Sequence, residues 1–231
     1  MRKKRPIIGI TKPESKRMNL SFLILAITVW LSGGKVKITS YDENIDDQHF
    51  DGLLLGGGTD VFPGLFFKDP IDNYAYDMKR DSLEVDLLKK ATRENLPVFA
   101  ICRGAQLMNV VNGGTLHLDM TKVYEGANYP DTYLSYLFFR KKIIVYEDTL
   151  LYKISRKKEM MVNSIHKRSI DKVGKDLIIT AREPNGVVQA IEKPGHPFFL
   201  GVQFHPERLF GKRVFRRLFR VFIETAGRKL G

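Results

Sequence analysis

The sequence predicts an α/β protein with a mostly parallel central sheet and helices on both faces of that sheet. Apolar runs without polar alternation, such as residues 51–58, are typical of strands that are covered on both sides. Amphipathic helical patterns lie between these runs, and this order of elements indicates crossover connections. The 231 residues, 43% of them hydrophobic, can bury one sizeable core. We therefore expect one domain over residues 1–231.

The first elements are predicted as strands over residues 6–11 and 35–41, with an apolar helix between them that ends near Ser32. This helix follows the basic start MRKKRP and superficially resembles a secretory signal. The apolar run begins late, however, and is too short to span a bilayer. A single cysteine cannot form an internal disulfide and fits a reducing compartment. We expect a buried helix in a cytoplasmic protein.

A second helix is predicted near residue 80. Residues 81–84, Asp-Ser-Leu-Glu, have the form of a capping box at the start of that helix. Pro97 then opens a strand over residues 97–101, and this strand leads to Cys102. One apolar face of the helix is marked by Leu83, Leu87, Leu88 and Ala91.

The second half of the chain has a different character. Residues 125–140 are aromatic and irregular, which indicates a surface excursion or flap. Turn signals then separate several short apolar runs, so we expect the sheet to continue as a small antiparallel extension. The predicted strands lie within residues 142–147, 176–183, 186–192 and 198–204.

Cys102 is the single cysteine and lies where a predicted strand gives way to a helix. A thiol at such a turn leaves the sheet beside free backbone N–H groups, and the helix dipole favours the reactive thiolate. From this stretch alone the alternative is a small buried apolar residue at the end of a core strand.

His205 ends an apolar strand, and Glu207 follows it across Pro206. A histidine can take the proton of Cys102, and a carboxylate can fix the tautomer of that histidine and stabilise the imidazolium. Taken alone, a histidine such as His205 is more often a surface residue at a strand end.

Residues 53–60, LLLGGGTD, end another predicted strand in a glycine-rich turn. A backbone N–H from Gly57 or Gly58 could face a developing oxyanion together with the N–H of Arg103. The glycines could instead form only a tight turn or a phosphate-binding loop. The phosphate loop is disfavoured because no Gly-Lys-Ser/Thr and no G-x-G-x-x-G pattern is present.

Together these segments resemble the class I glutamine amidotransferase superfamily. Within it, the Cys-Arg-Gly motif and the preceding Arg-Asp-x-x-Glu resemble the γ-glutamyl-γ-aminobutyrate hydrolase branch. The match runs in consistent order from about residue 6 to residue 222. The segments that carry it are LLLGGGTDVFP, RDSLEVDLLKKA, LPVFAICRGAQLMNVVNGGTLHLDM, VNSIH and FFLGVQFHPE.

The resemblance implies a flavodoxin-like three-layer α/β sandwich that cleaves a γ-glutamyl amide through a γ-glutamyl thioester. It makes Cys102 the nucleophile, His205 the general base and acid, and Glu207 the partner that orients His205. It implies no metal and no organic cofactor. The matching substrate-binding positions are Gln106 for the γ-glutamyl group, and Ser164 and His166 at the border of the same pocket.

Three stretches depart from the family pattern, and all three are expected near the pocket or its rim. Lys167 and Arg168 stand where relatives commonly have a histidine and a glutamine. Asn112 occupies a position where a small or apolar residue is usual, and residues 140–142 are basic where a histidine is often found. These departures leave the predicted triad unchanged but leave the amine leaving group open.

The chain is strongly basic, with 38 Lys and Arg against 26 acidic residues and a net charge of +12, which attracts acidic partners. The last predicted helix is either an ordinary amphipathic helix with a solvated basic side or a basic surface for acidic lipid, nucleic acid or a polyglutamate-like substrate. No recognised nucleic-acid motif supports the nucleic-acid version. Its basic side carries Arg213, Arg216, Arg217 and Arg220.

Three hypotheses remain. We favour a free-standing hydrolase of a small γ-glutamyl substrate. The alternatives are a glutaminase subunit that passes ammonia to a synthase partner, and a binding or effector protein that uses its basic face. The sequence leaves a monomer or a homodimer open.

Overall fold

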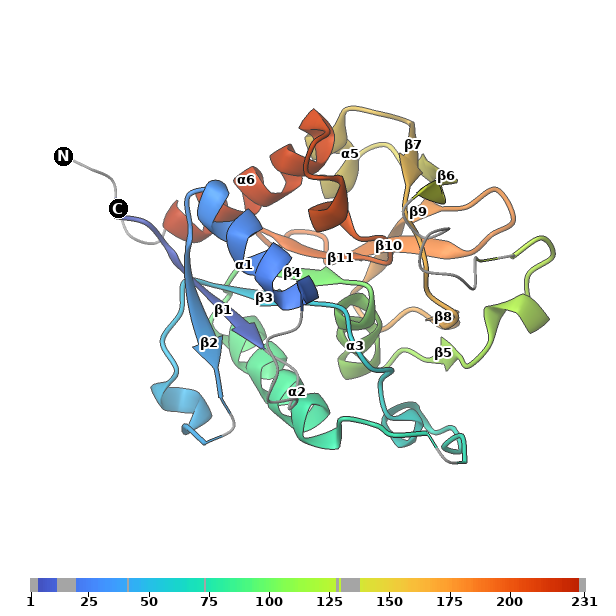
Figure 1. The fold of residues 1–231 in the computed structure, drawn as a ribbon, viewed down its shortest axis with the longest axis horizontal. Helices are drawn as coiled ribbons and strands as arrows, with labels where there is room; N and C mark the ends of the chain where they lie inside the picture. The colour runs from blue at the N-terminus through green and yellow to red at the C-terminus, as the bar shows by residue number, and fades with distance from the viewer. Residues whose placement is uncertain are drawn as a thin grey trace.

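A single sheet forms the middle layer of the protein (Figure 1). The computed structural model describes residues 4–11, 20–40, 42–72, 74–127, 129 and 138–228. Within these residues one half of the sheet is parallel and the other half antiparallel. The parallel half is, in spatial order, β2 (Lys35–Thr39), β1 (Ile7–Thr11), β3 (Gly52–Leu55), β4 (Val98–Ile101) and β11 (Phe199–Val202). The antiparallel half continues with β10 (Val188–Glu192), β9 (Ile178–Arg182), β6 (Lys141–Val145) and β7 (Glu159–Val162).

Helices cover both faces of the sheet, which confirms the predicted three-layer arrangement (Figure 1). A separate short ladder pairs β5 (Leu116–His117) with β8 (Ser169–Ile170). One face is covered by α1 (Leu20–Leu31), α5 (Leu150–Ser155) and α6 (Arg213–Gly227), and the other by α2 (Met78–Arg93) and α3 (Arg103–Val111).

Successive residues of the central strands enter different layers of the core. In β3, Leu54 packs with the α1 and α6 side chains, whereas Leu53 and Leu55 pack with α2 and α3. In β4, Phe99 packs on the α1 and α6 side, and Val98 packs on the α2 and α3 side. Because both faces are covered, these strands need no polar alternation, as predicted.

The predicted capping box is wrong. Helix α2 begins at Met78, and the side chain of Asp77 accepts the N–H of Arg80 as its cap. Asp81 and Glu84 therefore lie inside the helix, where both are buried. Their spacing serves a different purpose, because both carboxylates face buried guanidinium groups.

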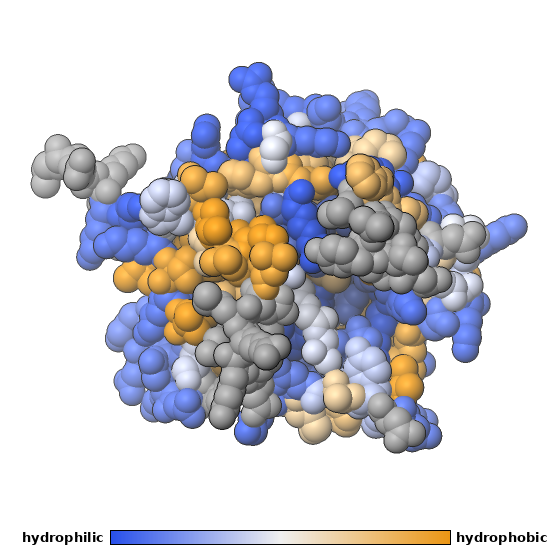
Figure 2. Space-filling view, viewed as in Figure 1, coloured by the Kyte–Doolittle hydropathy of each residue, from blue (hydrophilic) through white to orange (hydrophobic). Residues whose placement is uncertain are grey.

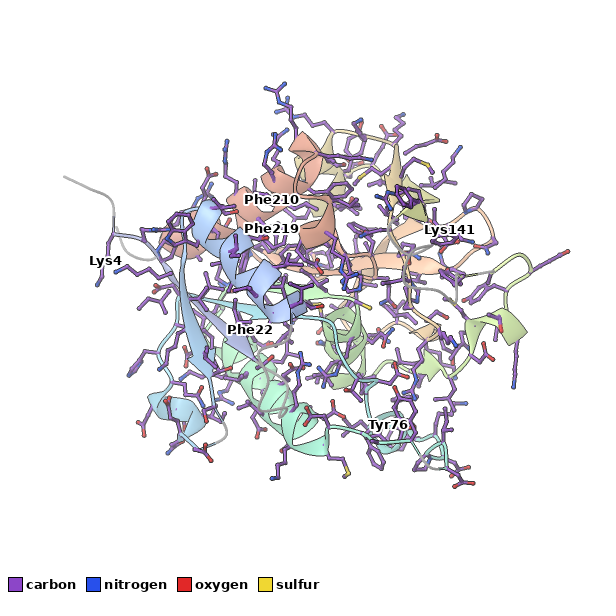
Figure 3. The ribbon with its side chains drawn as sticks, viewed as in Figure 1. Lys4, Phe22, Tyr76, Lys141, Phe210 and Phe219 are labelled. Carbon is purple, nitrogen blue, oxygen red and sulfur yellow. The ribbon has the colours of Figure 1, made fainter. Side chains whose placement is uncertain are left out.

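The last helix packs its apolar side on the sheet, as the amphipathic interpretation predicts. Figure 3 shows Phe219 of α6 next to Phe210, and Phe219 belongs to the same hydrophobic cluster as Phe22 of α1. Arg213, Arg217 and Arg220 are exposed. Arg216 is half-buried and donates to the carbonyls of Phe210 and Gly211.

Most of the predicted aromatic flap, residues 128 and 130–137, lies outside the described residues. No helix in the described part of the chain is both long and apolar enough to cross a bilayer. Helix α5 and strands β5, β7 and β8 had not been predicted, because each is short and carries only a weak periodic pattern.

Candidate active site

Cys102 lies on a strained turn between β4 and α3. Its backbone has φ 53° and ψ −108°, a conformation that residues with a Cβ rarely adopt. Its N–H donates to the carbonyl of Val202 in β11 (2.7 Å), which fixes the turn to the neighbouring strand. Gly104 lets α3 approach β3 closely, since a Cβ there would lie 2.6 Å from the carbonyl oxygen of Leu55. Cys102 itself is only partly buried.

His205 and Glu207 lie in the segment just after β11, which ends at Val202. The short 3-10 helix Pro206–Leu209 turns the carboxylate back, so that Oε1 of Glu207 lies 2.7 Å from Nδ1 of His205. Both side chains are buried, and the N–H of His205 donates to Oδ1 of Asn163 (3.2 Å). With Nδ1 held by the carboxylate, Nε2 is left for proton transfer.

The imidazole of His205 lies against Gly57 and close to Cys102. A Cβ added to Gly57 would lie 2.9 Å from Cε1 of His205 and 3.8 Å from Cβ of Cys102. Burial lowers the pKa of His205, but the charges of Glu207 and Cys102, with hydrogen bonds to both, raise it to about 10. A histidine with this pKa is an imidazolium at neutral pH and stabilises a neighbouring thiolate. The structure thus brings the three predicted triad residues together.

Gly58 and the side chain of Arg103 face a buried charge network next to the turn. A Cβ at Gly58 would collide with the guanidinium of Arg80. The guanidinium of Arg103 forms ion pairs with both Asp81 and Glu84. Nε of Arg80 lies 2.7 Å from Oε1 of Glu84. We call these four residues the Arg103 cluster: Arg80, Asp81, Glu84 and Arg103.

The Arg103 cluster fixes the glycine turn relative to the nucleophile. Oδ2 of Asp81 accepts the N–H of Phe62 (2.8 Å), and Arg80 donates to the carbonyl of Gly56 (3.5 Å). Burial opposes ionisation of Glu84, but the two guanidinium groups outweigh it and lower the pKa of this carboxyl. The cluster therefore holds paired charges, and these attach α2 and α3 to the turn that borders His205.

Gln106 lies one helical turn after the nucleophile and is buried. Its Nε2 donates to the carbonyl of Arg168 (3.1 Å) and lies 3.4 Å from Oε1 of Gln203. Nε2 of Gln203 in turn donates to the carbonyl of Cys102 (3.1 Å). The two glutamines therefore connect the nucleophile turn to the segment that contains His166.

Ser164 and His166 lie in a second buried polar network, built on the antiparallel half of the sheet. Oε1 of Glu183 accepts from the hydroxyl of Tyr129 (2.6 Å) and from Nε2 of Gln189 (2.7 Å). Oε2 of Glu183 lies 3.3 Å from Nζ of Lys141, which is labelled in Figure 3. Nε2 of Gln189 also lies 2.8 Å from Oγ of Ser164 and 3.2 Å from Nε2 of His166. We call these residues the Glu183 cluster: Tyr129, Lys141, Ser164, His166, Glu183 and Gln189.

His166 is neutral in this environment. Burial lowers its pKa to about 4, helped by the positive charges of His205 and Lys141 and opposed by the hydrogen bond to the carbonyl of Arg168. That carbonyl lies 2.5 Å from Nδ1, so Nδ1 carries the proton and Nε2 is an acceptor. His166 and His205 therefore differ in charge at neutral pH although they influence each other.

The residues that depart from the family pattern have different surroundings in the structure. Lys167 is exposed, whereas Arg168 is buried. Nη1 of Arg168 donates to the carbonyl of Val61 (2.6 Å), and Nε lies 3.1 Å from Oδ2 of Asp60. Its guanidinium also lies 5.7 Å from the ring centroid of Tyr76, labelled in Figure 3. Arg168 thus ties the segment after the glycine turn to that of His166.

Of the basic stretch 140–142, Lys141 belongs to the Glu183 cluster, while Lys142 pairs with Glu159 at the surface (2.7 Å). The expectation that Asn112 lies near the pocket is wrong. Asn112 is the C-cap of α3 and Cys102 is the N-cap, so the helix separates the two by about 15 Å.

The sequence interpretation missed Glu183, Gln189, Gln203 and Tyr129. Gln189 is an uncharged polar residue between the apolar residues Val188 and Ala190 of β10, and Gln203 directly follows the apolar strand β11. A polar side chain at such a position has to find a buried partner, and this signal was available in the sequence.

Comparison with known proteins identifies the family of the chain. Residues 21–207 match the sequence profile of the family described as Peptidase C26. A protein of Rickettsia prowazekii named for its likeness to glutamine amidotransferases is 30% identical, with 97% of this chain and 99% of that protein covered. The γ-glutamyl-γ-aminobutyrate hydrolase PuuD of Escherichia coli is 33% identical, over 68% of this chain and 64% of its own length.

Solved structures agree on the fold. A Thermoplasma acidophilum protein named as a GMP synthase subunit has a TM-score of 0.69 at 18% identity, covering 96% of this chain and 94% of its own. A glutamine amidotransferase from Methylobacillus flagellatus has a TM-score of 0.66 at 13% identity, covering 96% and 95%. The chain therefore belongs to the Peptidase C26 family, as a glutamine amidotransferase-like hydrolase with the flavodoxin-like fold of the class I glutamine amidotransferases.

Proposed function

We propose that the protein is a cysteine hydrolase that cleaves the γ-glutamyl amide bond of a γ-glutamyl amine or peptide. The observation that carries this proposal is the meeting of Cys102, His205 and Glu207 where β4 and β11 end side by side. Relatives named γ-glutamyl-γ-aminobutyrate hydrolase, at 33–34% identity, support the choice of substrate class.

In the proposed reaction the Cys102 thiolate attacks the γ-carbonyl carbon. As the C–N bond breaks, the imidazolium of His205 gives its proton to the leaving amine, and a γ-glutamyl thioester remains. The neutral imidazole then takes a proton from water, and the resulting hydroxide attacks the thioester carbon. The C–S bond breaks, glutamate leaves, and the thiolate–imidazolium pair is restored. Glu207 holds Nδ1 throughout and stabilises the charged imidazole.

Backbone N–H groups beside the thiol are the proposed oxyanion donors. No acceptor in the described part of the chain takes the N–H of Gly57 or of Arg103. Both residues lie beside Cys102. Arg103 is the next residue of the chain, and Gly57 lies against the imidazole of His205. Gly58 completes the turn, and Gln106, Ser164 and His166 are the proposed border of the γ-glutamyl pocket.

Substrate turnover by the purified chain tests the proposal. We expect glutamate and amine to be released from γ-glutamyl amines, with little ammonia from glutamine. We expect Cys102→Ala to lose at least about 10⁴-fold in kcat/KM at unchanged Tm. Mass spectrometry of wild type during turnover should show the γ-glutamyl adduct on Cys102. Ammonia release from glutamine that rises with a partner protein would favour a glutaminase subunit instead, and no turnover of any γ-glutamyl compound would reject the proposal.

The pH profile tests the role of Glu207. Because the carboxylate raises the pKa of His205 toward about 10, the wild-type alkaline limb should lie far above the ordinary histidine range. Glu207→Gln removes the negative charge, so the imidazole loses its proton at lower pH and the limb of kcat/KM should move down. An unmoved alkaline limb would contradict the assigned role.

A further inference from the structure

Helix α1 presents an apolar face to solvent. The helix contains no charged residue, and Phe22, Leu25 and Val29 bury its other side in the core. This outer face is visible as the orange area left of centre in Figure 2. Its side chains expose between 39% and 61% of their surface and are Leu20, Leu23, Ile27, Trp30 and Leu31.

Basic side chains from other elements lie at both ends of this face. At its C-terminal end, Arg5 donates to the carbonyls of Trp30 (2.6 Å) and Gly33 (3.1 Å). The same guanidinium lies 5.7 Å from the centroid of the indole ring. At the N-terminal end, Arg208 donates to Oγ of Ser21 (3.2 Å).

Helix α6 adds positive charge beside α1, with which it is in contact. Its exposed arginines are accompanied by a single exposed acidic residue of the same helix, Glu224. Aliphatic and indole groups next to arginines match the two layers of a membrane surface, which are the acyl boundary and the anionic headgroups. The exposed arginines of this helix are Arg213, Arg217 and Arg220.

We propose that the exposed face of α1 binds the surface of a bilayer that contains anionic lipid. The 12 residues of α1 span about 18 Å, less than the roughly 30 Å of a hydrocarbon core, so the helix would lie in the plane of the interface. A second copy of the chain fits this face less well, because each copy carries a net charge of +12 and the arginine rims would oppose each other. Apolar contact and charge attraction act together, since either one alone gives weak, reversible binding.

The test uses Trp30, because it is the single tryptophan of the chain and reports directly on this face. The full chain is mixed with vesicles of phosphatidylcholine alone or of phosphatidylcholine with phosphatidylglycerol. We expect a blue shift of the emission, and quenching by lipids brominated on their acyl chains, only with phosphatidylglycerol present. Added salt should weaken binding by screening the arginines.

Variants separate the two contributions. Leu23→Gln with Ile27→Gln keeps Trp30 and should reduce partitioning at least about tenfold, because apolar groups are lost from the interface. Arg217→Glu with Arg220→Glu should abolish the preference for anionic vesicles. Ile178→Gln is the matched control, because this side chain is 41% exposed on β9, away from α1. All these side chains are exposed, so Tm should stay close to that of wild type.

An unchanged Trp30 emission, or equal binding to neutral and anionic vesicles, would overturn the proposal. The proposal would also be overturned if the Trp30 emission shifted to the blue without lipid as the protein concentration rises, and light scattering then gave the mass of a dimer. That result would assign the face to a second copy.

Discussion

Two buried polar clusters lie next to the active site, and they differ in how their charge is balanced. The Arg103 cluster pairs two guanidinium groups with two carboxylates, and its paired side chains are at most 4% exposed. The Glu183 cluster surrounds one carboxylate with neutral hydrogen-bonding groups and with Lys141, whose side chain is 18% exposed. Losing a partner therefore strands a buried charge in the first cluster, whereas in the second it removes mainly hydrogen bonds. We infer that the first cluster secures the fold around the nucleophile and that the second sets the polarity around His166.

The largest effect is expected from Glu84→Gln, because Arg80 and Arg103 then lose the carboxylate that they share. Breaking a buried ion network in this way typically costs about 3–5 kcal/mol of the free energy of unfolding. Urea unfolding measures this loss. Asp86→Asn is the control, since that half-exposed carboxylate on the same helix lies 3.9 Å from Lys89 and its change should cost about 1 kcal/mol or less. Equal losses in the two variants would remove the distinction between the clusters.

A smaller effect is expected on acidification, through His166. Its pKa is lowered to about 4 from 6.5, so below pH 6.5 the unfolded chain binds a proton that the folded protein resists. Stability is therefore fully present above pH 6.5 and is lost as the pH falls toward 4, by roughly 3 kcal/mol in total. His166→Gln should remove this part of the loss, whereas Ser164→Ala, in the same cluster, should retain it. Tm measured across this pH range tests the prediction. Identical profiles of Tm against pH for the two variants would contradict the role assigned to His166.

The smallest effect is expected from Glu183→Gln. The amide oxygen can still accept from Tyr129 or Gln189, and partly exposed Lys141 can be hydrated, so the loss should be about 1–2 kcal/mol. Glu159→Gln at the surface is the matched control and should cost less than about 1 kcal/mol. If Glu183→Gln were as costly in urea unfolding as Glu84→Gln, the charge balance of the clusters would not explain their difference.

The contrast between the clusters also shows what the sequence could predict. His205 and Glu207 are two residues apart, so their contact depends on local geometry that a motif can indicate. The central strands β3, β4 and β11 were equally predictable, because burial on both faces leaves continuous apolar runs. The carboxylates of α2 were misread because spacing alone cannot tell a cap of backbone N–H groups from a pair of buried arginines.

The Glu183 cluster could not be assembled from the sequence at all. Lys141 and Gln189 lie on different strands, Glu183 directly follows β9, and the other members lie outside the strands. Only the register of the antiparallel strands brings Lys141, Glu183 and Gln189 together. Asn112 shows the opposite case, in which residues close in sequence lie far apart in space. It is close to Cys102 along the chain, yet the rigid rise of α3 carries it to the far end of the helix.

The partly buried cysteine at the strained turn has a chemical consequence as well. Cys102 is the chain's only cysteine, so a thiol-directed reagent labels this one position and its stoichiometry counts intact sites. Peroxide would convert the thiolate to a sulfenic acid, and the chain holds no second thiol to capture that acid as a disulfide. Recovery from oxidation then depends on a small thiol supplied from outside, and without one the damage proceeds to the irreversible sulfinic acid.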